Sequence, residues 1–199
     1  MILPNQLTVL RIILTPVFLF FFLMEDPIYK QISVVIFIIA AITDWYDGWL
    51  ARKFNYITEW GKFLDPLADK ILTSTAFFAF VALDVLELWM VIAIVIRDVI
   101  VTGLRLYADF NKRAFATSRS AKWKTFLQMA FLYYLLLMYT FQTIEPFYTN
   151  NAEVFSVLTD PTGIFYSMLL ITVFTLYTGF TYLYKNRFLI KQLFVIETE

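Results

Sequence analysis

The chain has 199 residues, of which 60% are hydrophobic, 20% are aromatic and only 16% are charged. Average soluble domains carry about a quarter charged residues, so this composition favours a lipid bilayer as the surrounding solvent. Cysteine and histidine are both absent, which excludes disulfides, thiol nucleophiles, zinc–thiolate sites and histidine-based triads. The formal net charge is zero, and the bulk charge therefore gives no indication of a nucleic-acid partner.

Six apolar runs along the chain are each long enough for a membrane-spanning helix, which needs about 20 residues. They predict an all-α, polytopic membrane protein in which residues 1–199 form a single integral membrane domain. The polar segments 25–30 and 84–87 are expected to be loops, and 143–162 is expected to be the longest connection. After about residue 142 the sequence indicates apolar helices and nothing more specific. The predicted spans are 7–24, 31–51, 64–83, 89–109, 124–142 and 163–185.

Lysine and arginine are distributed unevenly between the two faces that six spans would define. One face carries both termini and the loops near 52–63 and 110–123, and it holds every basic residue except Lys30. Cytoplasmic loops of membrane proteins are enriched in Lys and Arg. We therefore expect a protein integral to the cell (inner) membrane, with both termini and these loops in the cytoplasm.

Four aspartates lie in the segment 44–69, where the second and third predicted spans meet. On a helix, residues three or four apart share a face, so Asp44 and Asp47 form one pair. Asp65 and Asp69 form a second pair by the same rule. Acidic residues in a membrane segment are costly and mark functional sites by default, and hard oxygen ligands suit Mg²⁺, Mn²⁺ or Ca²⁺. The four carboxylates together predict a divalent-cation site on the cytoplasmic side.

Taken singly, these aspartates have ordinary structural explanations. Asp44 could form a buried ion pair with Arg52. Asp65, which precedes Pro66, could be the N-cap of a helix, because Asp is favoured at that position and Pro at the next. A membrane interior offers too few basic partners to neutralise all four carboxylates, and this favours the metal site for the group as a whole.

The glycines and the arginine near these acids complete a specific pattern. Eight fixed positions over 26 residues run as Asp44-x-x-Asp47-Gly48-x-x-Ala51-Arg52, eight residues, Gly61-x-x-x-Asp65-x-x-x-Asp69. This pattern resembles, without a departure, the signature of the CDP-alcohol phosphatidyltransferase family. The resemblance implies the CDP-alcohol phosphotransferase fold of about six transmembrane helices, usually as a homodimer. It also implies transfer of a phosphatidyl or related group from a CDP-linked donor to an alcohol, with release of CMP.

The same resemblance implies roles for individual residues. Mg²⁺ or Mn²⁺ is the expected cofactor, as two ions, and the expected ligands are Asp44, Asp47, Asp65 and Asp69. Asp65 and Asp69 are the expected catalytic residues, with Asp69 as a further ligand or as the base that takes the proton from the attacking hydroxyl. The residues expected to bind the CDP-lipid are Asn5, Thr8, Asp47, Gly48, Ala51, Arg52 and Gly61.

Two further stretches help to choose the acceptor alcohol. Residues 4–11 and 118–129 resemble the family members that use glycerol 3-phosphate, although Ala121 stands where those members often have Gly. Asp98 follows Arg97 where relatives often show Glu. A phosphorylated acceptor needs fixed positive charge, and Arg provides a two-pronged donor for phosphate while Lys provides a point charge. The residues expected to bind the acceptor phosphate are Arg97, Arg105, Lys122, Lys124 and Thr125.

The resemblance thus implies an enzyme that transfers the phosphatidyl group of CDP-diacylglycerol to glycerol 3-phosphate within membrane lipid, with the active site facing the cytoplasm. Two alternatives stay open. The nearer one is a family member with another acceptor, such as phosphatidylglycerol in a cardiolipin synthase, inositol phosphate, serine or choline. The more distant one is a cation-coupled transporter, although no internal repeat relates the two halves and the acidic cluster lies toward one face.

Overall fold

The computed structural model describes residues 3–54, 59–111 and 119–190. Side chains are described at these positions except at 3–5, 44–45, 47–52, 54, 59–60 and 62. Within these ranges the regular structure is helical and no strand occurs, which confirms the prediction of an all-α chain. The helices are α1 (Leu3–Phe22), α2 (Pro27–Phe54), α3 (Glu59–Ala82), α4 (Leu88–Phe110), α5 (Arg119–Phe141), α6 (Glu145–Asn150), α7 (Ala152–Leu158) and α8 (Pro161–Lys185).

The long helices of the described chain, α1 to α5 and α8, coincide closely with the six predicted apolar runs. Two of the expected loops are wrong in part. The segment 25–30 is a loop only at its beginning, because α2 starts at Pro27, and proline is favoured in the first turn of a helix. There Asp26 Oδ1 accepts a hydrogen bond from the Ile28 amide at 2.9 Å. The connection 143–162 contains the short helices α6 and α7, whereas the loop at 84–87 is confirmed.

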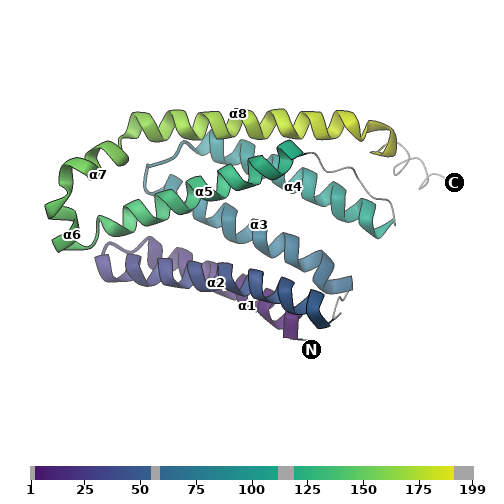
Figure 1. Cartoon of the computed structure of the whole chain (residues 1–199), viewed down its shortest axis with the longest axis horizontal. Helices are drawn as coiled ribbons and strands as arrows, with labels where there is room; N and C mark the ends of the chain where they lie inside the picture. Colours follow the sequence, from purple (N-terminus) through teal and green to yellow (C-terminus); the bar gives the residue numbers. More distant parts are fainter. Residues whose placement is uncertain (1–2, 55–58, 112–118, 191–199) are drawn as a thin grey trace.

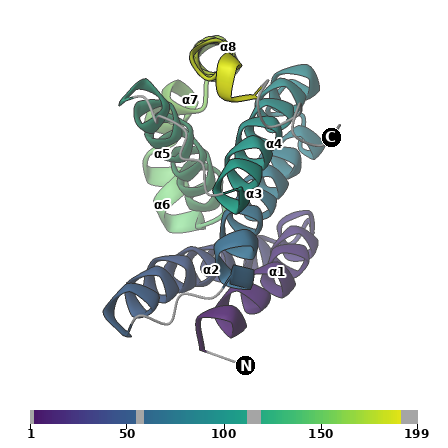
Figure 2. The ribbon, with the colours of Figure 1, turned by 90° about the vertical axis from the view of Figure 1, so that its right-hand side faces the viewer.

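The long helices run roughly along one axis (Figure 1). At one end of the bundle α1 begins, α2 ends, α3 begins and α8 ends, whereas α6 and α7 lie at the other end. Seen along this axis, α1 and α2 lie together on one side and α3 lies in the middle (Figure 2). On the opposite side α8 lies against α4 and α5. Because the long helices of the described chain are even in number, the beginning of α1 and the end of α8 lie at the same end of the molecule.

The apolar core fills the half of the bundle nearer to α6 and α7. The rings of Phe18 and Phe37 are 5.2 Å apart between α1 and α2. Phe80, near the end of α3, packs on Phe22 at 5.2 Å and on Tyr139 at 5.5 Å. These rings are buried or half-buried and belong to one cluster that also includes residues of α4 and α8. The densely packed half of the molecule therefore lies away from the predicted aspartate site.

The outer surface of the bundle is apolar, with exposed large side chains on most of the long helices, among them Phe20, Val35, Ile96, Val173 and Phe180. By length and composition, one helical segment of the described residues, Ala152–Lys185, is suited to cross a membrane. Gln6–Phe22 and Pro27–Thr43 are apolar but shorter. The helices α3 and α4 carry charged residues within their length. The arrangement of six spans therefore stays a prediction.

Candidate active site

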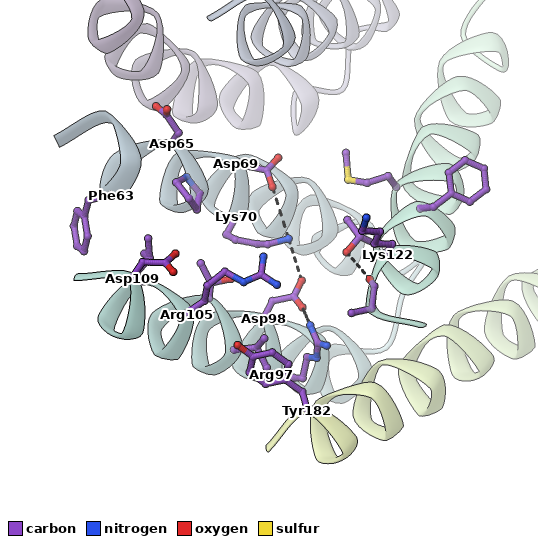
Figure 3. A pocket seen from close by; sticks show the side chains of 18 of the residues that line it. Phe63, Asp65, Asp69, Lys70, Arg97, Asp98, Arg105, Asp109, Lys122 and Tyr182 are labelled. Carbon is purple, nitrogen blue, oxygen red and sulfur yellow. Dashed lines mark hydrogen bonds and ion pairs between the residues drawn. The ribbon is translucent and has the colours of Figure 1, made fainter. Parts of the chain in front are cut away.

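A cavity of about 1160 Å³ opens between α3, α4, α5 and α8, in the half of the bundle away from α6 and α7. Apolar side chains such as Phe63, Val101 and Met129 form part of its wall. Charged side chains of both signs lie among them (Figure 3), namely Asp65, Asp69, Lys70, Arg97, Asp98, Arg105, Asp109 and Lys122. Charged groups inside an apolar bundle are retained where they act on a substrate or an ion. This cavity is therefore the candidate site.

The acidic wall of the cavity is provided by α3. Asp65 and Asp69 lie one helical turn apart and both line the cavity. They point to one side of α3, whereas Lys70 points toward Asp98 on α4 (Figure 3). Asp65 Oδ1 accepts a hydrogen bond of 2.5 Å from the hydroxyl of Thr8, a fully buried residue of α1. A hydrogen bond of this kind fixes the direction in which a carboxylate presents its other oxygen.

The position of Asp65 in the helix removes one structural explanation for it. The helix α3 begins at Glu59, well before Asp65, and Pro66 lies inside the helix. Asp65 is therefore not an N-cap. Pro66 also lacks the backbone amide hydrogen that an interior helical position would use, so the Asp65–Pro66 dipeptide needs an explanation other than helix initiation.

The other predicted acidic pair lies on α2, whose backbone is helical through residues 44–52. The side chains of these residues lie outside the described part of the structure, as does that of Asn5. The predictions that fall there concern Asn5, Asp44, Asp47, Gly48, Ala51 and Arg52. Among the described side chains, no group of three possible metal ligands occurs. The described pair, Asp65 and Asp69, does fit the expected ion, because carboxylate oxygens on a cavity wall are the ligands that Mg²⁺ and Mn²⁺ prefer.

The opposite wall is built around Asp98, a residue of α4 with only 3% of its surface exposed. Its Oδ1 lies 2.9 Å from Arg97 Nη1 and 2.5 Å from Nζ of Lys124 on α5. Its Oδ2 lies 3.4 Å from Nζ of Lys70 on α3. Three cations from three helices thus meet at one buried carboxylate.

The ammonium group of Lys70 connects the two walls. It lies 3.4 Å from Asp98 Oδ2 and 3.7 Å from Asp69 Oδ2 (Figure 3). Neither Lys70 nor Asp98 is among the site residues that the sequence predicts. Asp98 carries the same signal as the other acids, a carboxylate inside an apolar run. The position of Lys70 next to Asp69 gave no comparable signal, because a lysine in the cytoplasmic half of a predicted span was counted only among the basic residues of that face.

Of the five residues expected to bind the acceptor phosphate, four line the cavity, namely Arg97, Arg105, Lys122 and Thr125. The fifth, Lys124, lies behind the wall, because its side chain has no exposed surface and its Nζ contacts Asp98. In this arrangement Lys124 adds positive charge to the wall without a surface for direct contact with a substrate.

The last long helix also contributes to the site. Thr178 Oγ1 on α8 accepts a hydrogen bond from Arg97 Nη2 at 3.2 Å. Arg97 also lies directly over Gly179, where an added Cβ would be 2.8 Å from Arg97 Cγ. Tyr182 lines the same cavity as Arg105. The sequence indicated only an apolar helix here, because threonine, glycine and tyrosine are common in membrane-spanning helices.

The chain matches a known protein family. A family model described as CDP-alcohol phosphatidyltransferase matches residues 1–159. This range covers most of the chain and includes the whole aspartate pattern. The chain belongs to the CDP-alcohol phosphatidyltransferase family and is a transferase.

Individual relatives carry a more specific name. The chain is 41% identical over 147 residues to a protein of Bacillus subtilis named CDP-diacylglycerol–glycerol-3-phosphate 3-phosphatidyltransferase, covering 68% of this chain and 76% of the relative. Proteins with the same name from Rickettsia typhi and Salmonella typhimurium are 38% and 40% identical. The match to the Rickettsia typhi protein covers 68% of this chain and 76% of that relative. The match to the Salmonella typhimurium protein covers 67% of this chain and 75% of that relative.

Proposed function

We propose that this protein transfers the phosphatidyl group of CDP-diacylglycerol to glycerol 3-phosphate, forming phosphatidylglycerophosphate and releasing CMP. One observation carries the proposal: a single cavity has two carboxylates of α3 on one wall and a group of Arg and Lys side chains on the other. The first wall suits a metal-dependent displacement at phosphorus, and the second suits an acceptor that carries its own phosphate. The names of the relatives support the same pair of substrates.

In this proposal the hydroxyl oxygen of glycerol 3-phosphate attacks the phosphorus of the phosphatidyl group. A new bond forms between phosphorus and that oxygen, the bond between phosphorus and the CMP oxygen breaks, and the hydroxyl proton passes to Asp69. Asp44, Asp47, Asp65 and Asp69 would hold two Mg²⁺ or Mn²⁺ ions, which supply charge neutralisation for the attacking and leaving oxygens. The position of Asp69 on the cavity wall supports its role as the base.

The donor and the acceptor would lie on different sides of Asp65 and Asp69. For the CDP-lipid we propose Asn5, Thr8, Asp47, Gly48, Ala51, Arg52 and Gly61, a set that belongs to α1, α2 and the beginning of α3. Gly61 and Thr8 are buried. For the acceptor phosphate we propose Arg97, Arg105, Lys122 and Thr125 on α4 and α5, with Lys124 acting on the phosphate through its charge.

The membrane arrangement is part of the proposal. The six long helices of the described chain would each cross the inner membrane within one domain formed by residues 1–199, and the end of the bundle that holds the cavity would face the cytoplasm. The excess of Lys and Arg in the segments at that end supports this orientation. Two copies would form a homodimer, as the resemblance to the family implies.

The deciding experiment supplies purified protein in mixed micelles with CDP-diacylglycerol and a panel of alcohols, and it measures CMP release with and without Mg²⁺ or Mn²⁺. The panel contains glycerol 3-phosphate, phosphatidylglycerol, inositol phosphate, serine and choline. We expect release only with a divalent ion and fastest with glycerol 3-phosphate. Faster CMP release with another alcohol would show that this alcohol is the preferred acceptor. No release with any alcohol would overturn the enzymatic proposal.

A further inference from the structure

Asp98 is the one carboxylate among the described residues at which three cationic side chains meet. Lys70 from α3, Arg97 from α4 and Lys124 from α5 lie within 3.4 Å of its two oxygens. Each of these chains is long and has many rotamers, so that holding three of them in one place costs conformational entropy. A shared partner is therefore the simplest reason for their convergence.

The balance of charge in this cluster is unequal. Three cations surround Asp98, and Lys70 also pairs with Asp69 at 3.7 Å, so these five groups carry one more positive than negative charge. The like charges repel one another strongly where water is excluded. Lys124 has no exposed surface, and a buried ammonium group is stable only with a partner of opposite charge. Asp98 supplies that partner and at the same time leaves positive charge over for a further anion.

The cluster presents this excess charge to the cavity. Lys70, Arg97 and Asp98 line the cavity, whereas Lys124 lies behind them. The Lys70 side chain is 19% exposed and the Arg97 side chain is 11% exposed, so both can be reached from inside the cavity. An anion entering between α4 and α5 would meet these two side chains with their positions already set.

The position of Arg97 is held from a second direction by α8. Its Nη1 donates to Asp98, and its Nη2 donates to Thr178 at 3.2 Å. Its aliphatic part lies on Gly179, where no side chain intervenes. The guanidinium group is thus held on two sides, and little reorganisation is needed when it receives a planar pair of phosphate oxygens.

We propose that Asp98 is a positioning residue, which holds Lys70, Arg97 and Lys124 as one preformed binding surface for the phosphate of the acceptor. This inference rests on the proposed function, because it takes glycerol 3-phosphate as the source of that phosphate. Asp98 does not touch the phosphate, since both are anions. It acts through the three cations, and Lys70 connects the same surface to Asp69.

The test compares Asp98→Asn and Asp98→Glu with wild type in two assays. The first is the rate of CMP release at varied glycerol 3-phosphate and at varied CDP-diacylglycerol. The second is the dissociation constant for inorganic phosphate, measured by calorimetry without nucleotide or metal. Asp84→Asn is the matched control, because Asp84 is exposed in the 84–87 loop at φ 56, a conformation that Asn adopts as readily as Asp.

Asp98→Asn is expected to raise both the KM for glycerol 3-phosphate and the dissociation constant for phosphate by about tenfold, the size of losing one hydrogen bond to a charged group. The KM for CDP-diacylglycerol and kcat should change by less than about twofold. Asp98→Glu should recover most of the loss, because it restores the carboxylate. If Asp98→Asn does not fold, Asp98→Asn with Lys124→Met removes the unpaired buried charge, and both constants are expected to rise above those of Lys124→Met alone.

The result that would overturn the inference is specific. If Asp98 only offset the charge of its neighbours, its neutralisation would strengthen phosphate binding, and both constants would fall. Unchanged constants, or equal rises for both substrates, would also contradict a positioning role. Failure of the proposed function looks different: wild type would release no CMP with glycerol 3-phosphate, and the phosphate dissociation constants would then decide the inference alone.

Discussion

The hydroxyl of Thr8 lies 2.5 Å from Asp65 Oδ1 and joins α1 to α3 at the edge of the cavity. The sequence placed Thr8 among the residues that bind the CDP-lipid, and that role stays a proposal. The structure adds a contact to the carboxylate that is expected to bind metal. A donor behind a metal ligand fixes its orientation and usually affects metal affinity.

Thr8→Val removes this donor with little change in shape, and it should weaken Mn²⁺ binding by about tenfold to a hundredfold. Electron paramagnetic resonance of the purified protein measures free Mn²⁺ directly, without turnover. Thr15→Val is the control, because Thr15 is also buried in α1 but its hydroxyl donates to the Arg11 carbonyl at 2.8 Å. Equal Mn²⁺ affinities in the two variants would contradict the proposal that the Thr8 hydroxyl orients Asp65 for metal binding.

Asp65→Asn and Asp69→Asn should each lower CMP release by at least about a hundredfold, the usual contribution of a positioned acid or base. The two losses should differ in kind. Excess Mn²⁺ should restore part of the activity of Asp65→Asn, because a weakened ligand set still binds at high ion concentration. It should restore none in Asp69→Asn if Asp69 is the base. Full activity of either folded variant would remove the role of that residue.

Gly179→Ala should raise the KM for glycerol 3-phosphate, because the new Cβ would lie 2.8 Å from Arg97 Cγ and would push the side chain aside. Gly103→Ala is the matched control on α4, since nothing lies within 4 Å of an added Cβ there. Alanine exceeds glycine in helix propensity by about 1 kcal/mol, so Gly103→Ala should raise the melting temperature in detergent and leave the kinetics unchanged. The same KM in both variants would contradict the role of the contact between α4 and α8.

Arg105→Met should raise the KM for glycerol 3-phosphate by about tenfold, since a direct charge-assisted phosphate contact is lost. Arg119→Met is the comparison, because Arg119 is exposed at the first residue of α5. An arginine at such a position suits anchoring to anionic lipid. Steady-state rates at varied acceptor and varied donor separate the cases. If Arg105→Met alters only the KM for CDP-diacylglycerol, Arg105 belongs to the donor site.

The positions of the long helices could be predicted because each apolar run is close to the length that a bilayer requires. Their first residues were harder to predict. The loop predicted at 25–30 includes Pro27, yet Pro27 begins α2, because the first turn of a helix does not need the amide hydrogen that proline lacks. The short helices α6 and α7 were missed because their turns are set by local contacts within a polar connection.

The aspartates could be selected from the sequence because their spacing puts them on shared helix faces. The cluster around Asp98 could not, because its members come from α3, α4 and α5 and meet only after the helices pack. Lys124 shows the same limit. The positive charge of Lys124 and its approximate position near the acceptor were predicted. Its burial behind Asp98 depends on how α5 is rotated about its own axis, which is set by helix packing.

The support that α8 gives to Arg97 has a consequence for how the protein can change. Thr178 and Gly179 lie beyond residues 1–159, the range that the family model matches, whereas Asp65 and Asp69 lie inside it. If Arg97 binds the acceptor phosphate as proposed, substitutions in the last helix can change acceptor binding while the carboxylates stay the same. Exchanging α8 between relatives would be a direct way to shift the preference for an alcohol without rebuilding the reaction.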